Sequence, residues 1–238
     1  MNSTNQASPS VKPLTHVIEG RPDFAYLRVQ LPAQETLRVE ASAMQAMDKH
    51  VTMRTKLKGG FKRLLTGENL FLNEFTAQGK EGELVLGSSL PGDIKRLYLT
   101  QNGPALFLQS GSFLAASTGI ETQTKFQGLI KGFFSGAGLF LIKCVGEGDI
   151  FFNSYGGIIE IQVENEFIID NNHIVAFTEG LEYSVEKFGG YKSFFFSGEG
   201  LVARFHGHGR IWIQTRAMPS FFAWLNPFRR VVTKTKRN

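Results

Sequence analysis

Short segments in which apolar and polar side chains alternate run through most of the chain. The clearest is Ile159-Glu160-Ile161-Gln162-Val163-Glu164, and weaker alternation marks residues 51–55 and 120–124. A period of two places one face of a strand on a core and the other face in water. Glycine, asparagine and aspartate turns separate the segments. The pattern predicts an all-β protein of short strands in sandwiches or barrels, with little helix.

One sixteen-residue pattern occurs three times, at residues 55–70, 124–139 and 186–201. An alignment without gaps superposes Lys56, Lys125 and Lys187, and each copy ends on a Thr/Ser-Gly-x-Asn/Gly turn followed by leucine. Such a match indicates an internal triplication. We therefore expect one domain, residues 24–216, built from three β-sandwich lobes of about six strands each, at about 24–87, 95–156 and 157–216.

The two ends of the chain lie outside these repeats. Residues 1–23 begin with a polar, proline-containing stretch without the apolar segment of a secretory signal, and we expect a flexible leader. Residues 217–238 form an aromatic and basic arm, which we expect to be a short helix or an irregular segment. Its aromatic and first basic residues are Phe221, Phe222, Trp224, Phe228, Arg229 and Arg230.

Charge separates the arm from the rest of the chain. The net charge is +5, yet residues 200–238 contain eight Lys or Arg and no acid, whereas residues 1–199 contain 18 bases and 21 acids. A mildly acidic body makes nucleic acid an unlikely partner, although the basic pI and the expected fold keep nucleic-acid binding as an alternative. The single cysteine, Cys144, excludes an intrachain disulfide and is consistent with a cytoplasmic protein.

Aromatic side chains followed by basic ones are typical of a segment that binds an anionic membrane surface. The arm has this composition, so we expect it to contact a membrane or a neighbouring subunit. The alternative is that its aromatic rings cap an open lobe of the same chain. Truncation of the arm would separate the two interpretations.

Candidate chemistry elsewhere is sparse. A three-lobed arrangement about an axis would bring Lys56, Lys125 and Lys187 together as a basic triad, although ordinary solvated strand lysines explain them equally well. His206 and His208 are spaced to share a metal ion, but the local sequence supplies no further ligand, and exposed turn histidines are the simpler interpretation. No nucleophile elbow, zinc-protease motif or dinucleotide-binding fingerprint is present. We therefore expect no catalytic residues and no cofactor, and we expect Cys144 to be a core residue.

Several segments resemble the altered-inheritance-of-mitochondria-24 family and its bacterial relatives. They are residues 131–139, 193–201, 170–176 and 209–215, the last reading Gly-Arg-Ile-Trp-Ile-Gln-Thr. The resemblance implies three β-sandwich lobes about a pseudo-threefold axis, each similar to the tryptophan RNA-binding attenuation protein fold. It implies no catalytic residues, and relatives in mitochondria are connected with inner-membrane organisation and respiratory-complex assembly. Kinship to an RNA-binding fold transfers no function by itself.

Together these features predict a non-enzymatic scaffold or assembly protein. We expect a homo-oligomer, because stacked lobes have edge strands and apolar faces that need covering. We expect it in the cytoplasm, with peripheral attachment to a membrane through the arm. A nucleic-acid-binding protein and a small-ligand-binding module are the alternatives.

Overall fold

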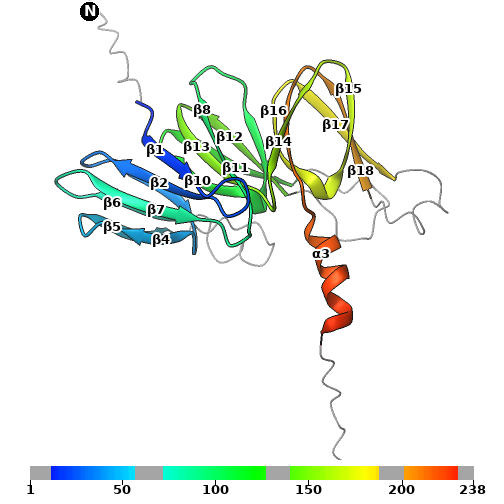
Figure 1. Cartoon of the computed structure of the whole chain (residues 1–238). Helices are drawn as coiled ribbons and strands as arrows, with labels where there is room; N and C mark the ends of the chain where they lie inside the picture. Colours follow the sequence, from blue (N-terminus) through cyan, green and yellow to red (C-terminus); the bar gives the residue numbers. More distant parts are fainter. Residues whose placement is uncertain (1–11, 57–71, 127–139, 188–200, 230–238) are drawn as a thin grey trace, which may run out of the picture.

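The computed structural model describes residues 12–56, 72–126, 140–187 and 201–229, and within them the protein is almost entirely β-strand (Figure 1). An N-terminal strand, β1 (Thr15–Glu19), is followed by eighteen strands that fall into three consecutive groups of six. One α-helix, α3 (Met218–Leu225), and a 3-10 turn, η3 (Asn226–Phe228), follow the last strand. The prediction of an all-β fold is confirmed.

The first group contains β2 (Tyr26–Leu31), β3 (Thr36–Glu40), β4 (Met44–Met47), β5 (Val51–Lys56), β6 (Leu72–Ala77) and β7 (Gly82–Gly87). The second contains β8 (Ile94–Leu99), β9 (Leu106–Gln109), β10 (Phe113–Ser117), β11 (Ile120–Phe126), β12 (Phe140–Gly146) and β13 (Gly148–Asn153). The third contains β14 (Ile158–Val163), β15 (Glu166–Asp170), β16 (Ile174–Thr178), β17 (Leu181–Lys187), β18 (Leu201–Gly207) and β19 (Gly209–Gln214). Short 3-10 turns, η1 (Ser110–Ser112) and η2 (Asn171–His173), precede β10 and β16.

Each group pairs its strands in the same order. The orders β2-β7-β4, β8-β13-β10 and β14-β19-β16 make one three-stranded half, and β3-β6-β5, β9-β12-β11 and β15-β18-β17 make the other. The ladder register shifts at one equivalent place in each group, just before Ala46, Ala115 and Ala176. Such a shift marks a β-bulge, which bends the strand locally.

Neighbouring groups are joined by shared sheets. Strand β3 pairs antiparallel with β10, and β9 pairs antiparallel with β16, so each of the two six-stranded sheets contains three strands from one group and three from the next. The fully buried Phe151 of the second group packs in the core of the first, and Trp212 of the third packs in the core of the second. Ladders and side-chain packing therefore link the groups in a row (Figure 1).

A closed three-fold arrangement would need one more ladder, between β15 and β4. Among the described strands, β4 pairs with β7 alone and β15 pairs with β18 alone. Figure 1 shows β4 and β15 at opposite ends of the row. The pseudo-threefold axis therefore stays a prediction.

A β-strand is present in the segment that the sequence predicted to be a flexible leader. Residues 15–19, which we expected to belong to the flexible leader, form β1 and pair with β2 along five residues. The backbone N–H of Leu14 donates a hydrogen bond of 2.6 Å to the buried carboxylate of Asp149 in the second group. The leader boundary at residue 23 is therefore wrong, because β1 covers the outer edge of β2.

Cys144 lies on β12 and is fully buried, which confirms its assignment to the core. Burial among apolar neighbours raises the pKa of its thiol to about 12. The thiolate that would act as a nucleophile is therefore scarce at neutral pH.

The carboxyl group of Glu40, the last residue of β3, should make stability depend on pH. Burial raises its pKa to about 7, so the folded state binds the proton more tightly than the unfolded chain does. This contribution to stability is complete below about pH 4.5 and is lost as the pH rises through 7. We expect Glu40→Gln to stabilise the fold by about 1 kcal/mol at pH 8 and to change little at pH 4, since partial solvent contact weakens the effect. Urea unfolding at the two pH values measures it. The exposed Glu81→Gln is the control, and equal shifts for the two variants at pH 8 would rule out the assignment.

Candidate functional site: the C-terminal aromatic helix

Helix α3 follows the last strand directly. Ala217 has an extended backbone, and Pro219 falls in the first turn, where its missing N–H costs nothing. Asn226 and Pro227 end the helix and lead into η3. A helix of eight residues is marginal on its own, so contacts made by its side chains matter for its stability.

The aromatic side chains of this segment are largely exposed. Phe222 is 57%, Trp224 64% and Phe228 71% exposed, and no residue of α3 is buried. The rings instead contact each other, with centroids 6.0 Å apart for Phe221 and Trp224 and 5.6 Å apart for Trp224 and Phe228. Phe221 also meets the ring of Tyr155 edge to face at 6.0 Å. The segment thus presents a connected aromatic surface, which does not match the alternative in which its rings cap a lobe of their own chain.

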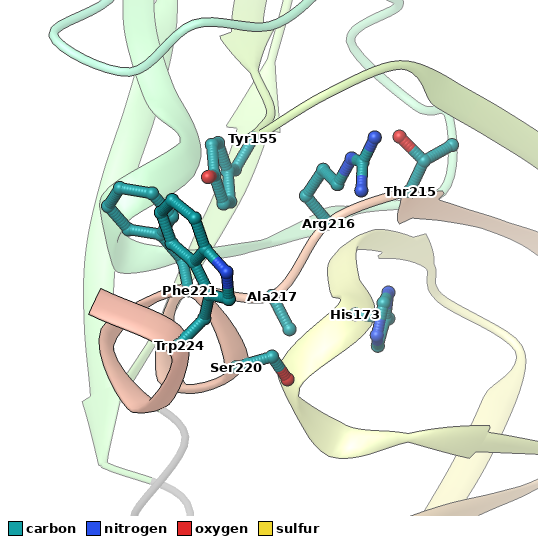
Figure 2. Close-up of a pocket in the computed structure, with 8 residues that line it drawn as sticks. All are labelled: Tyr155, His173, Thr215, Arg216, Ala217, Ser220, Phe221 and Trp224. Atoms are coloured by element: carbon teal, nitrogen blue, oxygen red, sulfur yellow. The ribbon is translucent and has the colours of Figure 1, made fainter. Parts of the chain in front are cut away.

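A pocket of about 540 Å³ lies at the root of the helix (Figure 2). His173 Nδ1 lies 2.6 Å from the backbone oxygen of Gln214, and the Gln214 side-chain oxygen accepts the backbone N–H of Tyr155 at 2.9 Å. These contacts hold η2, β19 and the segment before β14 together around the pocket. Its wall is formed by Tyr155, His173, Thr215, Arg216, Ala217, Ser220, Phe221 and Trp224. The sequence does not indicate Tyr155 and His173 as site residues, because they come from separate segments and carry no motif.

Basic residues accompany the aromatic surface. Arg229 directly follows η3 and is exposed, and no acid occurs between residues 200 and 238. Arg230, the other predicted member of this surface, lies outside the described residues. The surface formed by Phe221, Phe222, Trp224, Phe228 and Arg229 is called the α3 surface below.

The three lysines of the predicted basic triad are not equivalent in the ladders. Glycines with positive φ, Gly146 and Gly207, end β12 and β18 and pair with Ile120 and Leu181. Lys125 is the fifth residue after Ile120, whereas the fifth residue after Leu181 is Glu186. Lys187 therefore lies one ladder position beyond the equivalent of Lys125, while Lys56 does match Lys125. The gap-free alignment of the repeated block is thus offset by one residue from the strand register in the third group, and the basic triad stays a prediction. The side chains of all three lysines lie outside the description.

His206 and His208 lie at the end of β18 and in the turn to β19, and both are exposed. His206 Nδ1 is 3.4 Å from Glu166 Oε2, on the residue opposite it in the ladder with β15. The sequence gives no sign of this carboxylate, because it lies on a different strand, forty residues earlier. No cluster of three or more His, Cys, Asp or Glu suited to a metal ion occurs within the described ranges. The structure thus places a carboxylate beside His206 and adds no support for the metal site.

Many basic residues of the β-strands face acids. Their pairs include Arg28 with Glu83 at 2.8 Å, Lys95 with Glu160 at 3.1 Å, Lys143 with Glu179 at 3.1 Å and Arg204 with Glu186 at 2.7 Å. A groove that tracks a nucleic-acid backbone needs basic groups available to phosphates. These pairs give the strands a mixed surface, which disfavours the nucleic-acid alternative.

In the part of the chain that the structure describes, no helix has the length and apolar character needed to cross a bilayer.

Comparisons with known proteins agree with one another. The model of the mitochondrial biogenesis AIM24 family matches residues 16–216. An uncharacterised protein of Streptococcus pyogenes serotype M6 is 28% identical in an alignment of 239 residues that covers 94% of this chain and 95% of that protein. The crystal structure of a protein from Streptococcus pyogenes superposes with a TM-score of 0.76 at 27% identity, covering 91% of this chain and all of that one. The matched region runs from β1 to the residue before Ala217, so α3 lies outside it. The chain belongs to the mitochondrial biogenesis AIM24 family.

Proposed function

We propose that this protein is a non-enzymatic, oligomeric scaffold that attaches to an anionic membrane surface through the α3 surface. The observation that carries the proposal is the exposure of more than half of Phe222, Trp224 and Phe228 on a segment that follows the β-strands. Exposed aromatic clusters of this kind mark interaction sites in proteins that are otherwise well packed. A cytoplasmic protein with peripheral attachment fits this surface.

The positive charge of the C-terminal arm favours an anionic lipid surface as the partner of the α3 surface. The sequence places Arg229, Arg230, Lys234, Lys236 and Arg237 after the aromatic cluster, and no acid offsets them. Each basic residue near an anionic leaflet contributes about 1 kcal/mol. Five of them, with partial burial of the rings, would give attachment on the order of micromolar strength.

Removal of the aromatic rings should weaken vesicle binding. We expect the full chain to co-sediment with vesicles of phosphatidylcholine containing phosphatidylserine and not with phosphatidylcholine alone. Combining Phe222→Ala, Trp224→Ala and Phe228→Ala should lower the affinity at least about tenfold, since burial of each ring is worth about 1.5–3 kcal/mol when complete. Met53→Ala, which removes an exposed side chain on β5, is the matched control and should bind as the parent does.

Trp224 offers an independent readout. The other tryptophan, Trp212, is already fully buried, so a blue shift of emission on vesicle addition would report Trp224 entering the interface. Absence of co-sedimentation by the parent with anionic vesicles, or equal binding by the triple variant, would contradict the proposal. Salt-sensitive retention of single-stranded RNA by a chain ending at residue 217 would favour the nucleic-acid alternative instead.

The three groups of strands are, we propose, copies of one triplicated unit, each similar to the tryptophan RNA-binding attenuation protein fold. The identical strand order and the recurring bulge support this. A pseudo-threefold relation among the copies would follow if the missing β15–β4 contact were made.

A further inference from the structure

We infer that the edge of β15 in one copy of this protein pairs antiparallel with the edge of β4 in a second copy. The inference deepens the proposed scaffold role, because it names the interface through which the oligomer forms. It rests on strands only and requires no lipid.

The strands that join the groups are always the same two. Within the chain, the second strand of one group pairs with the third strand of the next, as β3 with β10 and β9 with β16. The second strand of the last group is β15, and the third strand of the first group is β4. The chain thus makes this strand pairing twice, and β15 and β4 are the two strands left without the corresponding partner.

The other open edges do not share this property. Strands β5, β11 and β17 are equivalent and lie at an edge in every group, as do β8 and β14. Strand β1 covers β2, their equivalent in the first group. Among the described strands, β4 and β15 alone are edges whose equivalents are paired on both sides.

Side chains on β4 are exposed where those of its equivalents are buried. The bulge places Met44 at the position of Phe113 and Ile174, which are buried, and Ala46 at the position of Ala115 and Ala176. Ala115 and Ala176 are fully buried, whereas Ala46 is exposed. Met47 is 43% exposed, although Ala116 and Phe177 at the same position are buried. Every described residue of β4 is exposed.

The same contrast holds on β15. The ladders to β6, β12 and β18, the fifth strand of each group, align Phe167 with Leu37 and Leu106, both of which are buried. Phe167 is 41% exposed. Ile168 next to it is also exposed, at 39%. An edge with adjacent exposed apolar residues is an aggregation hazard unless a partner covers it.

The hydrophobic core of the third group lacks an insertion from another group that the first two cores have. The core of the first group receives Leu114, Ala115 and Phe151 from the second, and the core of the second receives Val175, Ala176 and Trp212 from the third. The third core receives no residue from the first group. The equivalents of the inserted residues there are Gln45, Ala46 and Val85, none of which is buried in this chain.

The register of the new ladder follows from the two existing ones. Val39 lies opposite Ala115 and Leu108 opposite Ala176, so Ile169 of one copy should lie opposite Ala46 of the other. Arg38 opposite Ala116 and Phe107 opposite Phe177 likewise place Ile168 opposite Met47. The contact uses different surfaces on the two copies, so it extends into a ring or a filament rather than stopping at a symmetric dimer. Because β4 and β15 of one chain lie at opposite ends of the row, the contact joins two copies (Figure 1).

Mixed cysteine variants test the register. A full chain carrying Ile168→Cys is mixed with one carrying Met47→Cys, and the mixture is oxidised with diamide. Residues opposite each other on antiparallel strands are within the range that a disulfide spans. We expect a linked species of twice 26.5 kDa from the mixture and little from either variant alone. Cys144 does not compete, because it is buried.

A control pair moves one of the two cysteines to a residue that is similarly exposed but lies on a different strand. Met53, which is 46% exposed on the edge strand β5, replaces Met47 as the cysteine site, and Ile168→Cys with Met53→Cys should not cross-link. A single chain with both Ile168→Cys and Met47→Cys should give linked chains of increasing mass. Equal yields for the control pair, or an internal loop within single chains only, would overturn the inference.

Light scattering on the reduced proteins gives a second measurement. The parent should have a mass above that of one chain, and Ile168→Lys or Met47→Lys should lower it to that of one chain while leaving the circular dichroism spectrum unchanged. A parent that stays monomeric over a hundredfold concentration range would also overturn the inference. Vesicle binding by the Ile168→Lys variant separates this result from the membrane proposal, because the α3 surface is intact in it.

Discussion

Replacing Trp212 with alanine is expected to lower the free energy of unfolding by about 3–5 kcal/mol. The indole is fully buried on β19 and meets the ring of Phe152 edge to face, with centroids 5.9 Å apart. Its Nε1 donates a hydrogen bond of 2.8 Å to Glu160 Oε2 across the β14 ladder. Since it packs among residues of the second group, its loss opens a cavity between the second and third groups. Urea denaturation followed by circular dichroism measures the change.

Two controls separate volume from hydrogen bonding. Trp212→Phe keeps most of the apolar contact and loses the donor to Glu160, and a cost of about 1–2 kcal/mol is expected. Trp224→Ala removes the other tryptophan of the chain, which is 64% exposed, and should change stability by less than about 0.5 kcal/mol. If Trp212→Ala costs no more than Trp224→Ala, the two groups are not held together by this side chain.

The all-β class follows from local information in the chain. Alternation at Ile159–Val163 predicts a strand with one wet face, and the structure has β14 at residues 158–163. Only Val163 of its six residues is buried, and Ile159, on the predicted core face, is exposed. The repeated block predicts equivalent strands, and the same strand order is observed in each group. Periodicity identifies strands with a single buried face, such as β7 and β9, whereas β10, β13 and β16 are buried at every position and show no alternation.

Contacts between groups could not be predicted in the same way. The apolar character of Phe151 and Trp212 predicts burial, but nothing local indicates that each packs in the core of the preceding group. The one-residue offset of Lys187 arises because strand register is set by pairing across the sheet and not by similarity along the chain.

One part of the candidate site could be predicted from the sequence and another part could not. Composition identified the aromatic segment that became α3, because its residues are consecutive. The exposure of Trp224 depends on where the helix leaves β19, and Tyr155 and His173 reach the pocket from distant segments. Proximity of this kind is a property of the tertiary fold alone.

Removal of the Asp149 carboxylate is the second substitution with a large expected effect. Asp149 on β13 is fully buried, and its Oδ1 accepts a hydrogen bond of 2.6 Å from Arg96 Nε on β8. Its Oδ2 accepts the backbone N–H of Leu14 at 2.6 Å, which anchors the chain just before β1. Asp149→Ala would leave a guanidinium and a buried N–H without their acceptor, and we expect a loss of about 3–5 kcal/mol.

A surface ion pair supplies the matched comparison for Asp149. Arg28 and Glu83 make a comparably short contact, but both side chains are partly exposed, so Glu83→Ala should cost about 0–1 kcal/mol. Asp149→Asn retains an acceptor for Leu14 and should fall between the two alanine variants. Hydrogen exchange of the β1 amides adds a local readout: Asp149→Ala should accelerate it beyond what the global loss of stability explains, and Glu83→Ala should not. If the two alanine variants lower the free energy of unfolding by similar amounts, the buried carboxylate does not anchor β1. The difference between the two losses measures what burial adds to an otherwise similar charge pair.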